Sequence, residues 1–166
     1  MLFRSEEFLS LAKIPEVSMQ MTNVNELVSN VLFSVEEWAR SQNIRLDKKL
    51  GEQCPLVSID KLFSEALKQL LNNAIEASSS GNRVTVSTHF ESHMSRIVIQ
   101  VIDSGSGISE PHLKKIFQPY FSTKKGKKGL GLTLAKRFVD LHRGTLSITS
   151  DTGPGTMVTL HLPIKI

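Results

Sequence analysis

Polar side chains that could bind a cation recur along one face of a predicted helix. Glu65, Gln69 and Asn73 follow one another at four-residue spacing, and each such step turns a helix only about 40° beyond one full turn. The three side chains therefore form one row at the border of an apolar face. A carboxylate and two amide oxygens suit a hard divalent cation that keeps some of its waters. A solvated helix face is the simpler alternative for such a row.

Asp103 and the glycines behind it form a second polar group, directly after a run of β-branched residues. Residues 103–108 read Asp-Ser-Gly-Ser-Gly-Ile. Two glycines allow the backbone to turn tightly and to approach a flat ligand. An ionised aspartate only accepts hydrogen bonds, so Asp103 could accept one from an exocyclic amine. An ordinary Asp-Gly turn is the alternative.

A second glycine-rich segment, Gly-Lys-Lys-Gly-Leu-Gly-Leu at residues 126–132, opens another predicted helix. Phosphates would suit this position, because the first N–H groups of a helix lack internal partners and the helix dipole favours anions. The segment is not a P-loop, since no Gly-Lys-Ser/Thr follows four variable residues, and its glycine spacing does not fit a dinucleotide fingerprint. A flexible loop ahead of a helix is the alternative.

The segment between the two glycine groups combines aromatic residues, small hydroxyls and a cation. Residues 116–124 read Ile-Phe-Gln-Pro-Tyr-Phe-Ser-Thr-Lys. Its rings could pack under a lid while Lys124 reaches a phosphate. The alternative is a solvated basic loop whose aromatic residues belong to the core.

Helical and alternating periodicities predict the elements that position these groups. Gly144 is expected to end the last helix as a left-handed C-cap. The predicted helices cover residues 5–14, 23–41, 58–80 and 130–142, and the predicted strands cover residues 44–50, 83–90, 96–102, 145–149 and 156–162. This order favours an α+β, two-layer α/β sandwich: a mixed, mostly antiparallel sheet of about five strands with three main helices on one face.

The composition is that of one globular domain and excludes disordered and fibrous classes. The chain has 166 residues, of which 40% are hydrophobic and 22% charged. Its net charge of +4 is scattered except at four neighbouring lysines, which favours a local anion site over a nucleic-acid surface. A single cysteine and the lack of a signal peptide or membrane span predict a cytoplasmic domain, whose parent protein could be anchored in the inner membrane.

In order and spacing, these segments resemble the GHKL nucleotide-binding superfamily, with its Bergerat-type fold, and within it the sensor histidine kinases. The resemblance covers roughly residues 22 to 163. Its asparagine, first glycine, phenylalanine and second glycine boxes resemble residues 69–77, 103–108, 117–124 and 129–132. Two positions depart from the pattern: Gln69 replaces the usual first asparagine, and Ser104 replaces the asparagine that commonly follows the aspartate.

The resemblance implies a site for ATP and magnesium. Asn73 would bind the magnesium, together with Gln69 and Glu65, and Glu65 and Lys124 would be catalytic. Asp103 would accept a hydrogen bond from the adenine amino group. The other nucleotide contacts implied by the resemblance involve Gly105, Gly107, Ile108, Phe117, Phe121, Gly129, Leu130, Gly131, Leu132 and Thr156.

The same resemblance implies transfer of the ATP γ-phosphoryl group to a histidine on a separate dimerisation domain, and from there to the receiver domain of a response regulator. The parent protein would be a homodimer and would not bind nucleic acid. Because the first histidine is His89, in a predicted strand, we expect residues 1–18 to be the tail of the phosphoacceptor helix with its linker. Residues 19–166 would form the ATP-binding catalytic domain. A GHKL-type ATPase, an anti-sigma-type serine kinase and a degenerate docking module are the alternatives.

Overall fold

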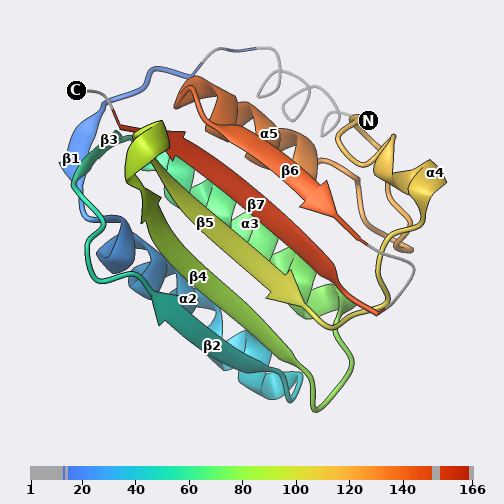
Figure 1. Ribbon diagram of the computed structural model, residues 1–166. Helices are drawn as coiled ribbons and strands as arrows, with labels where there is room; N and C mark the ends of the chain where they lie inside the picture. Colours follow the sequence, from blue (N-terminus) through green and yellow to red (C-terminus); the bar gives the residue numbers. More distant parts are fainter. Residues whose placement is uncertain (1–12, 14, 151–153, 165–166) are drawn as a thin grey trace.

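The computed structural model describes residues 13, 15–150 and 154–164 and has a layer of five strands packed against a layer of three helices (Figure 1). β2 runs parallel to β4, and the other neighbouring strands are antiparallel. In spatial order the strands are β2 (Arg45–Leu50), β4 (Arg83–Glu91), β5 (Arg96–Asp103), β7 (Thr156–Pro163) and β6 (Thr145–Thr149). The predicted two-layer α+β sandwich with a mixed, mostly antiparallel sheet is confirmed.

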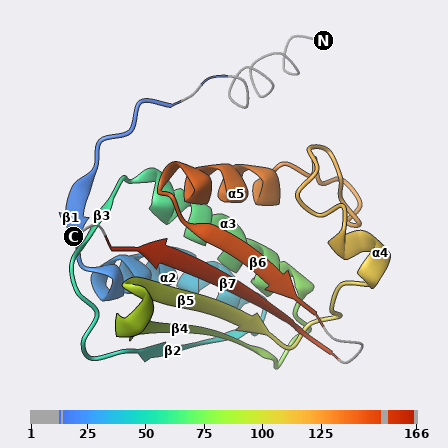
Figure 2. The same cartoon turned by 45° about the horizontal axis from the view of Figure 1, so that its top comes forward.

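The three main helices all cover the same face of the sheet, as the tilted view in Figure 2 shows. They are α2 (Val24–Ser41), α3 (Leu62–Ala77) and α5 (Gly131–Leu141). The middle helix, α3, packs against both other helices and the sheet, and its Phe63 and Leu67 are fully buried. Burial of each such side chain contributes about 1.5–3 kcal/mol. This packing fixes α3 firmly, so its polar row has a defined position.

The ends of the helices follow local chemistry, with one correction. The Asn23 side chain caps α2, accepting two backbone N–H bonds from the first turn at 3.0 and 3.4 Å. The expected left-handed cap at Gly144 is wrong, because Arg143 adopts that conformation, with φ 56°. Gly144 is needed for space instead: a Cβ there would lie 2.8 Å from the carbonyl oxygen of His161.

A short two-stranded ribbon precedes α3, and because of it the observed helix begins later than predicted. β1 (Gln20–Thr22) pairs with β3 (Val57–Ile59) in antiparallel register. The periodicity predicted a helix over residues 58–80, but the first residues of that range belong to β3, so α3 begins at Leu62. Pairing between strands of three residues leaves no periodic signal in the sequence.

Asp60 links this ribbon to the helical layer. Its buried carboxylate accepts hydrogen bonds from the Ser18 N–H at 2.6 Å and the Leu62 N–H at 2.8 Å. Its own N–H donates to Nε2 of the buried His142 at 2.9 Å, which places that histidine at the end of α5 in contact with the start of α3. The network therefore connects the segment before β1, which contains Ser18, with the start of α3 and the end of α5.

The remaining elements are short. The connection between β4 and β5 contains the 3-10 turn η1 (Ser92–Met94), and α4 (Glu110–Leu113) lies in the long connection after β5. The predicted helix over residues 5–14 falls outside the described residues, apart from residue 13. In the part of the chain that the structure describes, no helix has both the length and the apolar character needed to cross a membrane.

Candidate functional site

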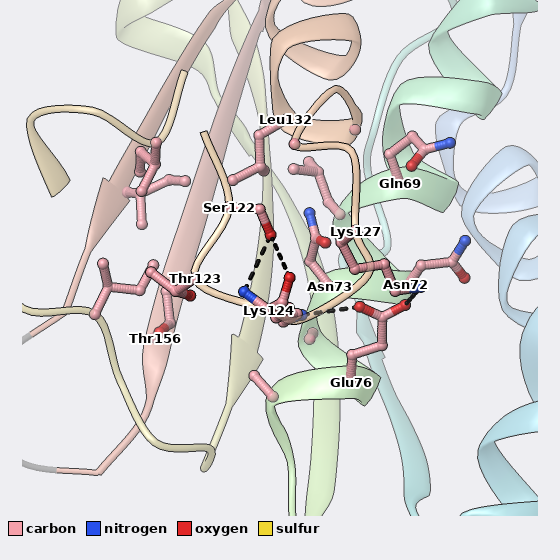
Figure 3. A pocket seen from close by; sticks show the side chains of 18 of the residues that line it. Gln69, Asn72, Asn73, Glu76, Ser122, Thr123, Lys124, Lys127, Leu132 and Thr156 are labelled. Atoms are coloured by element: carbon pink, nitrogen blue, oxygen red, sulfur yellow. Dashed lines mark hydrogen bonds and ion pairs between the residues drawn. The ribbon is translucent and has the colours of Figure 1, made fainter. Parts of the chain in front are cut away.

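A cavity of about 740 Å³ opens between α3, α5 and the connection from β5 to α5. Its walls also include the ends of β5 and β7. A volume of this size is typical of sites for small molecules and cofactors. Figure 3 shows how side chains from α3, α5, β7 and the connecting segment converge on this space.

The α3 wall carries Gln69, Asn73 and Glu76 (Figure 3). Glu65, the first member of the predicted row, is exposed and does not line the cavity. Two four-residue steps rotate its position by about 80° from Asn73 and move it about 12 Å along the helix. The expected placement of Glu65 beside the other two is therefore wrong. The sequence did contain a signal for Glu76, which lies three residues after Asn73 and so on the same helix face.

Asp103 ends β5 at the inner wall of the cavity. Its side chain is only 7% exposed, and its Oδ1 accepts the N–H of Gly105 at 2.8 Å. Burial raises the pKa of Asp103, although backbone N–H groups of Gly105 and Thr156 and the charge of Lys124 oppose this shift. Thr156 pairs with Asp103 across the β5–β7 ladder and lines the same cavity. The site thus has a buried carboxylate on its wall.

The first glycine segment folds against the end of α3. A Cβ on Gly105 would lie 2.3 Å from the Ala77 carbonyl oxygen, so a side chain there would collide with backbone. Gly105 does not line the cavity itself, whereas Gly107 and Ile108 do. The role of Gly105 is therefore to allow the close passage that directs the next residues into the cavity.

The second half of the connection forms a loop that lines the cavity and is closed on itself by a backbone hydrogen bond. We call this loop the lid ring and define it as residues 120–129. The N–H of Tyr120 donates to the carbonyl oxygen of Gly129 at 3.1 Å. Gly129 has φ +69°, and a Cβ there would lie 2.3 Å from the Phe121 carbonyl oxygen. Phe117 packs against the hydrophobic core and does not line the cavity. Phe121 does line it, with its ring 5.6 Å from that of His112.

Two lysines of the lid ring reach across the cavity to α3. Lys124 Nζ and Lys127 Nζ each lie 2.9 Å from a carboxylate oxygen of Glu76. Burial alone would raise the pKa of Glu76, but the hydrogen bonds and charges of the two lysines outweigh it and hold this pKa below the usual range. Glu76 is therefore an ionised carboxylate at neutral pH.

The start of α5 supplies an anion-binding wall. Gly129, Leu130, Gly131 and Leu132 all line the cavity. No side chain caps the first turn of α5, so its N–H groups are available to a bound anion. Gly131 also makes room for Gln69, whose Oε1 would lie 2.9 Å from a Cβ at that position.

The cavity brings most of the predicted residues together. The exceptions are Glu65, Gly105 and Phe117. The predicted residues that line the cavity are Gln69, Asn73, Asp103, Gly107, Ile108, Phe121, Lys124, Gly129, Leu130, Gly131, Leu132 and Thr156. Across the described ranges, no group of three or more His, Cys, Asp and Glu side chains could hold a metal ion. A cation in this cavity would therefore need amide oxygens or the oxygens of a bound ligand in addition to any single carboxylate.

Comparisons with known proteins agree with this geometry. Residues 59–166 match the family described as histidine kinase-, DNA gyrase B-, and HSP90-like ATPase. The chain is 34% identical over 161 residues to sensor histidine kinase ZraS of Escherichia coli strain K12, which covers 96% of this chain and 34% of ZraS. It is 32% identical over 161 residues to sporulation kinase C of Bacillus subtilis strain 168, covering 96% of this chain and 37% of that kinase. The chain thus spans about a third of the length of these relatives.

Solved structures show the same fold. The catalytic domain of histidine kinase ThkA superposes with a TM-score of 0.80 at 27% identity, covering 89% of this chain and 96% of that domain. ThkA in complex with the response regulator protein TrrA gives a TM-score of 0.82 at 25% identity and covers 97% of this chain and 46% of that one.

Proposed function

Because the chain belongs to the family of histidine kinase-, DNA gyrase B-, and HSP90-like ATPases, we propose that it is the ATP-binding catalytic domain of a sensor histidine kinase. In this proposal residues 19–166 form the catalytic domain, and residues 1–18 are the tail of a phosphoacceptor helix with its linker. The observation that carries the proposal is one cavity that combines a buried acceptor, Asp103, with a cationic lid and the start of α5.

The adenine end of the site is assigned to Asp103. Its carboxylate would accept the hydrogen bond of the adenine amino group, and its fixed position at the end of β5 would orient the base. Thr156 pairs with Asp103 across the β5–β7 ladder and lines the same cavity, as do Gly107 and Ile108. A guanine base has a carbonyl oxygen in place of that amino group, so the same carboxylate would reject it.

The phosphate end is assigned to the lid ring and α5. The backbone N–H groups at the start of α5 and the Lys124 ammonium would bind the phosphates. The amide oxygens of Asn73 and Gln69 would hold a magnesium ion beside the phosphates, and such an ion would neutralise part of their charge during transfer. Glu65 lies outside the cavity, so this assignment does not include it.

The reaction assigned to the site is phosphoryl transfer to a histidine nitrogen. The bond between the γ-phosphorus and the β–γ bridging oxygen would break, a nitrogen–phosphorus bond would form, and ADP would leave. The contribution of this chain would be to position the γ-phosphoryl group and to neutralise its charge. The acceptor histidine would belong to a dimerisation domain outside residues 19–166, and a response regulator receiver domain would take the phosphoryl group next. The parent protein would act as a homodimer, and the domain would work in the cytoplasm.

The carboxylates of the cavity favour transfer over hydrolysis. Asp103 and Glu76 are the acidic residues among the described residues that line it. Asp103 accepts hydrogen bonds from the backbone N–H groups of Gly105 and Thr156, and Glu76 is paired with two lysines. Neither is placed to activate water as the glutamate of a GHKL-type ATPase would. We therefore expect slow release of inorganic phosphate from ATP in steady-state assays.

The test has a binding part and a transfer part. Isothermal titration with ATP, in MgCl₂ and in EDTA, should show binding that magnesium strengthens. Equal affinity in both buffers would contradict the role of Asn73. With γ-labelled ATP the chain alone should form almost no phosphohistidine, whereas a separately expressed helical phosphoacceptor domain of its parent protein should become labelled. Strong labelling of the chain alone, or of a serine substrate, would overturn the assignment.

A further inference from the structure

Ion pairs between Glu76 on α3 and two lysines of the lid ring connect two walls of the cavity. Lys124 and Lys127 lie 48 and 51 residues away from Glu76 in sequence, and all three line the cavity (Figure 3). The Glu76 side chain is only 20% exposed, against 35% for Lys124 and 57% for Lys127. We call these three residues the lid clasp.

Within the lid clasp, the Glu76 carboxylate pairs with the two lysine ammonium groups that would otherwise be available to the phosphates of a nucleotide. A lysine that binds a phosphate oxygen gives up part of its contact with the carboxylate. Glu76 would then remain a mostly buried carboxylate close to a polyphosphate, and two such negative charges repel each other strongly where water is scarce. A cation between them removes this cost.

Asn73 lies three residues before Glu76, on the same face of α3 and on the same cavity wall. A magnesium ion held there through amide oxygen and phosphates would therefore face Glu76. The carboxylate could bind this ion directly or through its waters as the lysines move to the phosphates.

Resting on the proposed function, we propose that Glu76 is a specificity-determining residue that makes the site prefer magnesium-bound ATP to free ATP. In the structure, Glu76 binds the two lysines. Free ATP would draw the lysines away from Glu76 and leave its carboxylate without a cation. Magnesium-bound ATP would supply the carboxylate with a cation in place of the lysines.

The decisive variant is Glu76→Gln, which keeps the size of the side chain and removes its charge. We expect its affinity for ATP in EDTA to rise about ten-fold. Its affinity in MgCl₂ should stay equal or fall, so the ratio of the two dissociation constants should drop about ten-fold or more. Isothermal titration in both buffers measures this ratio.

Two controls keep the test sharp. Glu110→Gln changes the same charge on α4, where Glu110 forms an exposed ion pair with Lys114 outside the cavity lining, and it should leave the ratio unchanged. Adenosine has no phosphates and does not need the lysines, so Glu76→Gln should bind it as the unmodified chain does. Equal adenosine affinity shows that the variant is folded.

Limited proteolysis gives an independent readout. Trypsin cleaves after lysine, and the lid clasp restrains two lysines of the lid ring. Without nucleotide, Glu76→Gln should be cut in the lid ring faster than Glu110→Gln. An unchanged magnesium ratio in Glu76→Gln, or an equal loss of affinity in both buffers, would overturn the proposal. Failure of the unmodified chain to bind ATP at all would instead overturn the proposed function.

Discussion

At the scale of single residues, the proposed recognition of adenine depends on Asp103. Replacing it by Asn keeps the shape but presents an amide whose oxygen already receives the Gly105 N–H. Hydrogen bonds to charged groups contribute about 1.5–3 kcal/mol, so Asp103→Asn should weaken ATP binding about 10- to 100-fold. Asp140→Asn, at an exposed position on α5, is the matched control. Unchanged ATP affinity in Asp103→Asn would remove Asp103 from the site.

The same substitution should change the pH dependence of stability. Burial raises the folded-state pKa of Asp103 above its ordinary value of 3.8. Its contribution to the free energy of unfolding is therefore complete below that value and is lost as pH rises through the folded-state pKa. Without nucleotide, Asp103→Asn should gain stability relative to the unmodified chain from about pH 4 upward and then level off. Thermal unfolding of both proteins between about pH 4 and pH 8 measures this difference, and a difference that is constant with pH would contradict it.

Sequence reasoning placed most of the wall residues but misjudged one carboxylate. Asn73 and Gln69 are one helical turn apart, so spacing alone located them correctly. The predicted position of Glu65 on the cavity wall was wrong, because the small rotation at each four-residue step accumulates over two turns of the helix. Glu76 was missed as a site residue because its role depends on Lys124 and Lys127, which are distant in sequence. Contacts of this kind have no periodicity to detect.

At the scale of elements, the lid ring depends on the close approach of Gly129 to Phe121. Gly129→Ala would place a Cβ 2.3 Å from a backbone oxygen, at φ +69°. Gly126 has φ +76°, and a Cβ there would meet nothing within 4 Å, so Gly126→Ala is a control with similar backbone strain of about 1 kcal/mol. We expect Gly129→Ala to weaken ATP binding at least about ten-fold more than Gly126→Ala. Equal effects on ATP affinity would show that the close approach is unimportant.

The start of α3 depends on Asp60. Its ionised carboxylate accepts two backbone N–H bonds, and these bonds hold its pKa below the ordinary value of 3.8 despite burial. Asp60→Ala leaves both donors without this partner, and we expect a loss of about 2–4 kcal/mol in the free energy of unfolding. Asp60→Asn keeps one acceptor and should lose less. Urea unfolding gives the free energies, and faster exchange of the Ser18 amide should accompany the loss; equal stability of Asp60→Ala and the unmodified chain would contradict this role.

The long elements were predictable because their apolar positions repeat. The periodic run from Leu62 onward gave α3, and the alternating runs gave β4 and β5 nearly to their ends. The β1–β3 ribbon was not predictable, since two strands of three residues are fixed by pairing and by Asp60 rather than by their own pattern. The lid ring was predicted only as a loop, because its shape follows from contacts with α3.

At the scale of the whole molecule, nucleotide binding should be visible as stability. A ligand that binds only the folded state raises the free energy of unfolding by about 2.7 kcal/mol at 100 times its dissociation constant. Magnesium-bound ATP should therefore raise the unfolding temperature by several degrees, whereas magnesium-bound GTP at the same concentration should raise it much less. Equal shifts for the two nucleotides would contradict base recognition by Asp103.

The lid ring also makes this domain a suitable host for an inserted reporter. Its ends are joined by the hydrogen bond between Tyr120 and Gly129, so chain added between them would not separate the walls of the cavity. The free-energy cost of closing a flexible loop, which is entropic, rises by only about 0.6 kcal/mol for each doubling of the loop's length. Gly126 faces open space and is the natural insertion point. A fluorescent domain placed there would follow the position of the lid directly, turning the fold into a sensor of nucleotide occupancy.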